Sequence, residues 1–388
     1  MRWASVLQDG DATERAVMDG AKQVRADLEA EADLLFAFVS AHHRDEAPRV
    51  VDVLDEVFPG VPVVGCTGGG IIGGGVEAED APAVALMAAR LPGVDVSVHH
   101  LTDEDVPTAP PAWPSQLGVA PEEKPAFVLI PDPFSFDADA CIEALDAAYP
   151  GSTTVGGLAS GARAPGGHVL FAGRRAVRRG AVLVCLRGDV TIDPVIAQGC
   201  KPIGAPMLVS SCDRNVILGL DQKKPGDVLR EVFSSLDEDD RRLFRTSLFV
   251  GIEMHDQREY AAGDFLVRNI VGLSPDGDAL AVAGRIERWK AVQLHLRDRT
   301  TSSADLKRQL ERHRARCPSS PAGALLFSCL GRGANLYGEP NHDSRVFREI
   351  LGDVPLGGFF CNGEIGPVGP RTFSHGYTSA FALLRPRS

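Results

Sequence analysis

The sequence predicts a mixed α/β and α+β protein, in which repeated strand–helix–strand–glycine loop–strand units form mixed sheets and are accompanied by an antiparallel α+β middle module. Three observations support this fold class. One pattern recurs three times along the chain, and a stretch of different character separates its second and third copies. Of the 388 residues, 44% are hydrophobic and 24% are charged, which is typical of globular proteins. This length is sufficient for two domains that each have a core.

The first copy of the pattern begins with an apolar run at residues 33–39, which is typical of a buried strand. An amphipathic segment follows at residues 49–58, where apolar side chains recur at helical spacing. A second strand at residues 61–66 enters a loop that begins with Thr67 and continues with glycines. A further strand, at residues 83–87, closes the unit.

The same order of segments returns twice downstream, which indicates an internal repeat. Each later copy has a strand, a helix, a second strand that ends in glycine, and a closing strand. These segments lie at residues 126–130, 138–149, 153–157 and 181–184, and again at residues 324–329, 344–351, 354–358 and 378–384.

The stretch between the second and third copies predicts antiparallel structure. Residues 206–211 and 216–220 flank a short polar turn, as in a hairpin, and Asp227 is placed to cap a following helix. Four more strands and a charged helix are expected at residues 247–252, 265–271, 279–282, 292–296 and 304–316. We expect an N-terminal domain over residues 1–197 and a C-terminal domain over residues 198–388, which holds the antiparallel module (203–316) and the third repeat (322–388).

Composition and charge exclude several classes of partner. The net charge of −12 and the pI near 5.3 argue against a nucleic-acid-binding protein, which would carry a basic stripe. The arginines between Gly173 and Gly180 are expected on an exposed turn. No apolar run approaches the ~18 residues of a membrane span, and the first residues lack a signal-peptide pattern. We therefore expect a cytoplasmic protein that binds neither nucleic acid nor a membrane.

Cysteine spacing gives no sign of a metal or a redox motif. The eight cysteines form no Cys-x-x-Cys pair, and several lie inside apolar runs, where a thiol behaves as a small buried hydrophobe. No closely spaced set of metal ligands appears either. We expect no metal and no cofactor.

Specific motifs resemble one known family. Residues 357–367, Gly-Gly-Phe-Phe-Cys-Asn-Gly-Glu-Ile-Gly-Pro, look like the closing signature of FIST C-terminal domains. Residues 327–333 and 341–343 resemble the motifs that precede this signature, and residues 64–67 resemble the FIST N-terminal domain. Residues 265–270 and 294–298 match the middle strands of the family, so the resemblance covers nearly the whole chain.

The resemblance implies a sensory module of bacterial type that binds a small ligand such as an amino acid. Relatives couple this module to signalling or ubiquitin-ligase domains. This sequence has no kinase, methyl-accepting or F-box segment, so an output partner would be a separate signalling protein. The chain departs from the family pattern at residues 219–225, and again at residues 289–291, where the family favours a glycine.

Candidate ligand contacts lie in the third glycine loop and just before it. Asn362, Gly363 and Glu364 follow a buried strand, and open α/β sheets place ligands at the carboxyl ends of their strands. A carboxylate there could hold an ammonium group, although Glu364 could instead pair with an arginine such as Arg332. Arg332, between two glycines, is expected to be exposed or to cross a loop, where its guanidinium could bind a ligand carboxylate in bidentate fashion.

Two histidines and two further loop residues are also candidates. His342 and His375 can carry a proton near neutral pH, although a structural role is the more common one for such histidines. Asp343 is expected to cap the helix that follows it. Thr67 and Gly157, in the first two glycine loops, are expected to line the same ligand site.

Two alternatives to the sensory function remain open. Cys329 and Cys361 each end an apolar strand near glycines, so a thiol-dependent enzyme is conceivable if a base lowers the pKa of one thiol. The second alternative is a protein-interaction scaffold, in which the repeats only shape a docking face.

Overall fold

The computed structural model describes residues 1–107, 109–257, 259–261, 263–317 and 319–387. The chain forms two compact units, here called the repeat unit and the barrel unit. The repeat unit contains Met1–Ile196, Lys307–Ser374 and Thr378–Ser388, and the barrel unit contains Ala197–Leu306 and His375–Tyr377. In the described part of the chain, no helix is both long enough and apolar enough to cross a membrane. The predicted mixture of α+β and α/β structure is confirmed.

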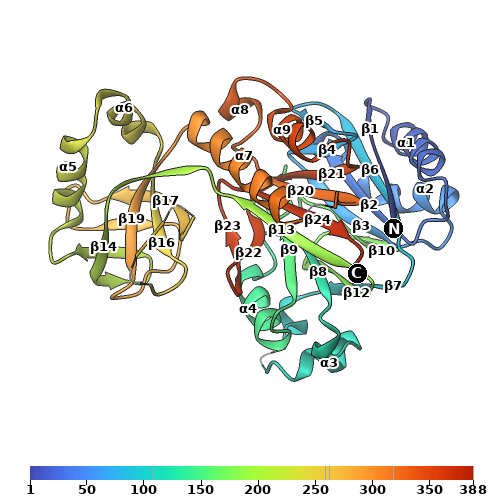
Figure 1. Cartoon of the computed structure of the whole chain (residues 1–388), viewed down its shortest axis with the longest axis horizontal. Coiled ribbons are helices and arrows are strands. Elements are labelled where there is room, and N and C mark those ends of the chain that lie inside the picture. The colour runs from blue at the N-terminus through green and yellow to red at the C-terminus, as the bar shows by residue number, and fades with distance from the viewer. Residues whose placement is uncertain (108, 258, 262, 318, 388) are drawn as a thin grey trace. The chain divides into compact units, whose positions relative to one another are not determined.

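Three mixed sheets make up the repeat unit, and each is built on one copy of the sequence repeat (Figure 1). In each copy the first two strands run parallel, and the closing strand lies antiparallel to the first. The three sets are β2 (Leu34–Ser40), β3 (Val63–Gly68) and β6 (Ala83–Arg90); β8 (Ala126–Pro131), β9 (Thr153–Gly157) and β12 (Ala181–Gly188); and β20 (Gly323–Cys329), β21 (Leu356–Cys361) and β24 (Ser379–Arg385).

The copies exchange hairpins in a cycle, which the sequence did not predict. The hairpin after each glycine loop pairs with the second strand of another copy, so that every sheet contains strands from two copies. These pairings are β4 (Gly70–Gly73) and β5 (Val76–Glu79) with β21, β10 (Leu170–Gly173) and β11 (Arg175–Val177) with β3, and β22 (Glu364–Val368) and β23 (Arg371–His375) with β9.

Each sheet also has an outer antiparallel strand beside its closing strand. These strands are β1 (Arg2–Asp9), β7 (Val94–Leu101) and β13 (Thr191–Ala197). The helices of the chain are α1 (Thr13–Leu28), α2 (Val50–Val57), α3 (Ala112–Leu117), α4 (Ala138–Ala148), α5 (Pro225–Ser235), α6 (Glu238–Thr246), α7 (Arg299–Arg316), α8 (Ala334–Tyr337) and α9 (His342–Leu351), with short 3₁₀ turns at Ala41–His43, Ala47–Arg49, Asp103–Asp105 and Pro121–Glu123.

Alternation along the buried strands explains the layers of the repeat unit. On β2, Phe36 and Phe38 enter a core shared by all three sheets, whereas Leu35 and Val39 pack against α1 and α2 on the opposite face. Both faces of the strand are therefore apolar, as expected for parallel strands between helices and a core. The central core is continuous from sheet to sheet, and it includes Phe327 of the third copy.

Six strands close into an antiparallel barrel in the other unit (Figure 1). Their order is β14 (Cys200–Asp213), β15 (Val216–Leu220), β18 (Leu280–Val282), β17 (Phe265–Leu273), β16 (Leu248–Glu253) and β19 (Ala291–Arg297). Helices α5 and α6 pack apolar side chains, such as Val228, on the barrel core. The predicted cap at Asp227 is wrong: α5 already begins at Pro225, whose fixed φ suits the first turn of a helix.

Candidate functional site

One glycine in the second strand of each repeat has an unusual backbone conformation. Gly65, Gly156 and Gly358 occupy the same place in the three repeats, with φ angles of +150°, +157° and +155°. A Cβ atom added to any of them would lie 1.8–1.9 Å from a carbonyl oxygen of the neighbouring strand. Only glycine permits this approach between two strands, so these positions allow the first two strands of each repeat to pack closely just before its glycine loop.

The three glycine loops meet at Ser160, a residue of the second repeat that hydrogen bonds to residues of the first and third repeats. The backbone N–H of Gly69 donates to Ser160 Oγ at 2.8 Å, and Ser160 Oγ donates to the carbonyl of Phe360. The backbone N–H of Ser160 donates to the carbonyl of Thr67 at 3.3 Å. Asn362 Nδ2 donates to the carbonyl of Ala159 at 2.9 Å. The fold therefore brings Thr67 and Asn362 to one junction, where both hydrogen bond to the second repeat.

Glu364 and Gly157 form a second part of this junction, and Glu364 breaks the internal symmetry. Each exchanged hairpin places one residue opposite the position that follows the strained glycine. In two hairpins this residue is apolar, Ile71 or Leu170, whereas in the third it is Glu364, opposite Gly157. The Glu364 side chain is fully buried, and its Oε2 accepts a hydrogen bond from the backbone N–H of Thr378 at 3.0 Å. This hydrogen bond offsets part of the cost of burying the carboxylate.

Arg332 is fully buried, so its expected exposure is wrong. Its Nε and Nη2 donate to the two carboxylate oxygens of Asp343 at 2.8 and 3.2 Å, and Nη2 also donates to Tyr337 Oη at 2.5 Å. Burial lowers the pKa of Arg332, but the Asp343 charge outweighs that effect and raises it, so the guanidinium stays charged. The predicted alternative pairing of Arg332 with Glu364 is replaced by this pair with Asp343.

Asp343 is the centre of a buried polar cluster rather than a helix cap. It accepts hydrogen bonds from Ser379 Oγ and Arg332, and His342 Nδ1 lies 3.0 Å from its Oδ1. Burial raises the pKa of Asp343, yet the Arg332 charge and these hydrogen bonds hold it well below its usual range. The N-terminal flanking residue of α9 is Asn341, so Asp343 lies within the first helical turn. The sequence therefore placed the start of this helix two residues too late.

Glu77 is a buried acid that the sequence analysis missed. Its Oε1 accepts the backbone N–H of Ser344 at 2.7 Å, while its Oε2 has no hydrogen-bond partner among the described residues. Burial, reinforced by the nearby charge of Asp343, raises the pKa of Glu77 to about 7. Arg332 Nη1 is likewise buried without a described partner. The only sequence signal was a pair of acids, Glu77 and Glu79, on the hairpin that follows the first glycine loop.

The predicted cysteines and His375 occupy different environments. Cys329 and Cys361 lie side by side at the ends of the paired strands β20 and β21. Cys361 is fully buried, and burial raises the pKa of its thiol well above the usual value, whereas Cys329 is only partly buried. His375 is buried and belongs to the barrel unit.

A pocket of about 910 Å³ lies on the barrel unit, and it combines aromatic and charged side chains. Pockets of this size commonly bind small molecules. Its charged groups are four carboxylates and two cations. The lining consists of Pro206, Met207, Leu208, Asp221, Glu253, Asp256, Gln257, Glu259, Tyr260, Arg288, Trp289, Lys290 and Ala291.

Glu253 is buried in the wall of this pocket and organises its neighbours. Its Oε2 accepts the hydroxyl of Tyr260, and its Oε1 lies 3.6 Å from Lys290 Nζ. Burial and the bond to Glu253 raise the pKa of Tyr260 to about 12, so the phenol keeps its proton. Gln257 Nε2 is buried and has no acceptor among the described residues. A buried donor without an acceptor is costly, and a ligand oxygen would satisfy it.

Trp289 supplies an exposed aromatic surface at the edge of the same pocket. Its side chain is 60% exposed, and the Arg288 guanidinium lies 4.5 Å from its ring centroid. Its φ of +71° lies in the left-handed region, which is uncommon for a large residue. Such strain is concentrated at functional sites, because the surrounding structure must hold it in place.

The architecture of the protein combines three repeats that exchange hairpins with a barrel unit. The barrel unit carries a pocket that is lined by both acids and cations. The FIST N domain model matches residues 33–223, and the FIST C domain model matches residues 225–367. The chain belongs to the FIST family. FIST domains are small-ligand-binding domains of signal transduction.

Bacterial relatives align with almost the whole chain. The uncharacterized protein MT0656 of Mycobacterium tuberculosis is 34% identical over 95% of this chain and 96% of its own length. The uncharacterized protein Mb0898c of Mycobacterium bovis is 34% identical over 95% of each chain. Human F-box only protein 22 is 32% identical, over 26% of this chain and 24% of its own length. A crystal structure of cyanuric acid hydrolase from A. caulinodans aligns with a TM-score of 0.33 and 8% identity, which supports no conclusion about fold or function.

Proposed function

We propose that this chain is a ligand sensor whose barrel pocket binds a small zwitterion, such as an amino acid or an amino-acid derivative. The observation that carries the proposal is the pocket's lining, in which acids, cations and an exposed aromatic ring face one space of about 910 Å³. A zwitterion presents both charges and can satisfy both kinds of side chain at once.

Each end of such a ligand has matching partners. Arg288 and Lys290 suit a ligand carboxylate, and the buried Gln257 Nε2 can donate to one of its oxygens. The exposed carboxylates of Asp256 and Glu259 suit an ammonium group. The pocket is larger than a single small amino acid requires, which favours a bulkier derivative or a short peptide.

The residues predicted from the glycine loops have a different role in this proposal. Asn362 and Thr67 bridge the repeats through hydrogen bonds, and Arg332 is engaged with Asp343 and Tyr337. We infer that the hydrogen bonds of Asn362, Thr67 and Arg332 hold the repeat framework together, although Arg332 Nη1 has no described partner. The response to ligand is passed to a separate signalling protein.

Thermal-shift and calorimetric titrations with a panel of amino acids, short peptides, diamines and dicarboxylates test the proposal. A ligand present at 100 times its Kd should stabilise the protein by about 2.7 kcal/mol. Arg288→Gln and Asp256→Asn should each weaken binding at least about tenfold, which corresponds to the loss of one charge-assisted contact.

Arg285→Gln is the matched control, because Arg285 is a mostly exposed arginine on the same segment outside the pocket lining. It should bind ligand like the unmodified protein. If no zwitterion stabilises the protein, or if the pocket variants and the control behave alike, the proposal is wrong.

A further inference from the structure

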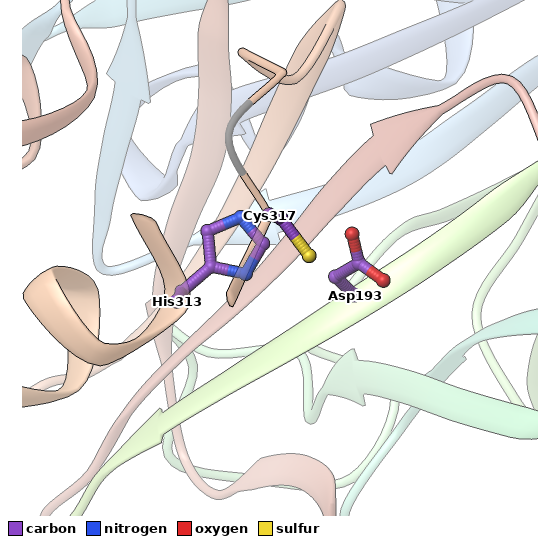
Figure 2. Close-up of side chains that lie close together, drawn as sticks. All are labelled: Asp193, His313 and Cys317. Carbon is purple, nitrogen blue, oxygen red and sulfur yellow. The ribbon is translucent and has the colours of Figure 1, made fainter. Parts of the chain in front are cut away.

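Three side chains of different chemistry converge in the repeat unit, away from the glycine turns. The carboxylate of Asp193, the imidazole of His313 and the thiol of Cys317 each place one ligand atom within 4.8 Å of the other two (Figure 2). Figure 2 shows the sulfur of Cys317 pointing toward the Asp193 carboxylate, with the His313 ring close by. Residues of this kind supply oxygen, nitrogen and sulfur ligands to metal ions.

The local structure explains why these residues meet. His313 and Cys317 are four residues apart at the end of α7, and the backbone N–H of Cys317 donates to the carbonyl of His313 at 2.9 Å. This helical hydrogen bond places both side chains on one face of the last turn. Asp193 comes from β13, a strand distant in sequence, so no motif search along the chain could assemble the set.

We propose that Asp193, His313 and Cys317 bind a zinc ion. Zinc accepts mixed nitrogen, oxygen and sulfur ligands at about 2.0–2.3 Å in tetrahedral geometry, which puts ligand atoms about 3.5 Å apart. The ligand atoms of the three side chains lie within 4.8 Å of one another, so the upper limit of their separation is about 1.3 Å above this value. Three protein ligands leave the fourth position for water or for a group from another molecule.

The protonation states required for zinc binding are accessible. The His313 side chain is largely buried, and burial lowers the pKa of its imidazole, so the ring is neutral near pH 7 and offers a lone pair. Its ring nitrogens make no hydrogen bond to any described residue. The Cys317 thiol must release one proton when zinc binds, so the affinity should rise with pH.

Arg385 already forms an ion pair with Asp193, and this pair could compete with zinc for the carboxylate. Its Nε and Nη2 donate to both carboxylate oxygens of Asp193, at 2.6 and 3.1 Å. An ionised carboxylate has about four lone-pair sites, so each oxygen can still bind a metal while it accepts from the arginine. The two charges of zinc would balance Asp193 and the Cys317 thiolate, and Arg385 would then give the site a net charge of +1.

Cobalt(II) provides a direct test, because a four-coordinate cobalt–thiolate site gives charge-transfer and visible bands that other ligand sets lack. Reduced protein should develop these bands with one equivalent of cobalt, and zinc should displace the cobalt. Cys317→Ser should abolish the charge-transfer band, and His313→Ala should weaken binding at least about tenfold.

Cys212→Ser is the matched control, since Cys212 is another partly buried thiol and lies in the barrel unit. It should retain the full spectrum. Circular dichroism identifies variants that remain folded. If the unmodified protein shows no thiolate band, or if the band persists in folded Cys317→Ser, the zinc site does not exist.

Discussion

Replacing Glu77 with glutamine should stabilise the protein above pH 7 and change little at pH 5. Glu77 is buried beside Asp343, and its Oε2 has no described hydrogen-bond partner, so its ionised form is poorly accommodated. Glutamine keeps an oxygen that can accept the Ser344 N–H, which is 2.7 Å from Glu77 Oε1. It also removes the charge that folding must bury.

The magnitude follows from the difference between the folded and unfolded pKa. The pKa of Glu77 is raised from 4.5 to about 7, and each unit corresponds to about 1.4 kcal/mol. The pKa difference of about 2.5 therefore sets an upper limit of about 3.5 kcal/mol. Because the folded state binds more protons than the unfolded chain between pH 4.5 and 7, this group lowers stability as the pH rises through that window. We expect about 1–3 kcal/mol of stabilisation in Glu77→Gln at pH 8, since the new amide N–H₂ must itself be buried.

Urea denaturation at pH 5 and pH 8 measures the effect. The free energy of unfolding of Glu77→Gln minus that of the unmodified protein should be below about 1 kcal/mol at pH 5, near the lower end of the window, and larger at pH 8. The control is Glu122→Gln, at an exposed glutamate in a short turn, which should show no such dependence. An equal difference at both pH values, or a loss of stability at pH 8, would refute the reasoning.

Three other predictions concern the framework and the thiols. Asp343→Asn leaves the Arg332 charge buried without its counter-ion and should lower the free energy of unfolding by about 3–5 kcal/mol; a loss below about 1 kcal/mol in urea denaturation would contradict the role of the pair. Gly156→Ala forces a Cβ atom to 1.9 Å from a backbone oxygen and should cost about 4 kcal/mol or more, whereas Gly151→Ala, at φ +82° with open space around it, should cost far less in the same assay. Cys361 should react with iodoacetamide only after unfolding, because burial raises its thiol pKa; rapid labelling of native Cys361, detected by peptide mass spectrometry, would instead favour a thiol enzyme.

Much of the strand and helix content could be predicted because buried segments carry a strong pattern. The run at residues 126–130 is entirely apolar, and β8 occupies Ala126–Pro131. The outer strand β1 was missed, since its sequence mixes Arg2, Ser5 and Gln8 with apolar residues and lacks a clean period. The exchange of hairpins was also missed. Strands pair through backbone hydrogen bonds, so the side chains of a hairpin do not identify the sheet that it joins.

The candidate site was predicted less well, and Arg332 shows why. Two flanking glycines suggested an exposed loop, but the side chain is buried because Asp343 neutralises it from the first turn of α9. That compensation depends on three-dimensional proximity. The barrel pocket also depends on three-dimensional proximity. Asp221, Glu253 and Trp289 line it from separate segments, and no sequence motif connects them. By contrast, the expectation that Thr67 and the third glycine loop line one site was based on the repeat, because each loop follows the second strand of its copy.

A crystal structure of the protein with the tightest zwitterion from the ligand panel tests the central claim most directly. The account predicts electron density for one molecule in the barrel pocket, with its carboxylate near Arg288 or Gln257 and its ammonium group near the acids. An empty barrel pocket, with the ligand bound instead at the junction of the glycine turns beside Glu364, would contradict it.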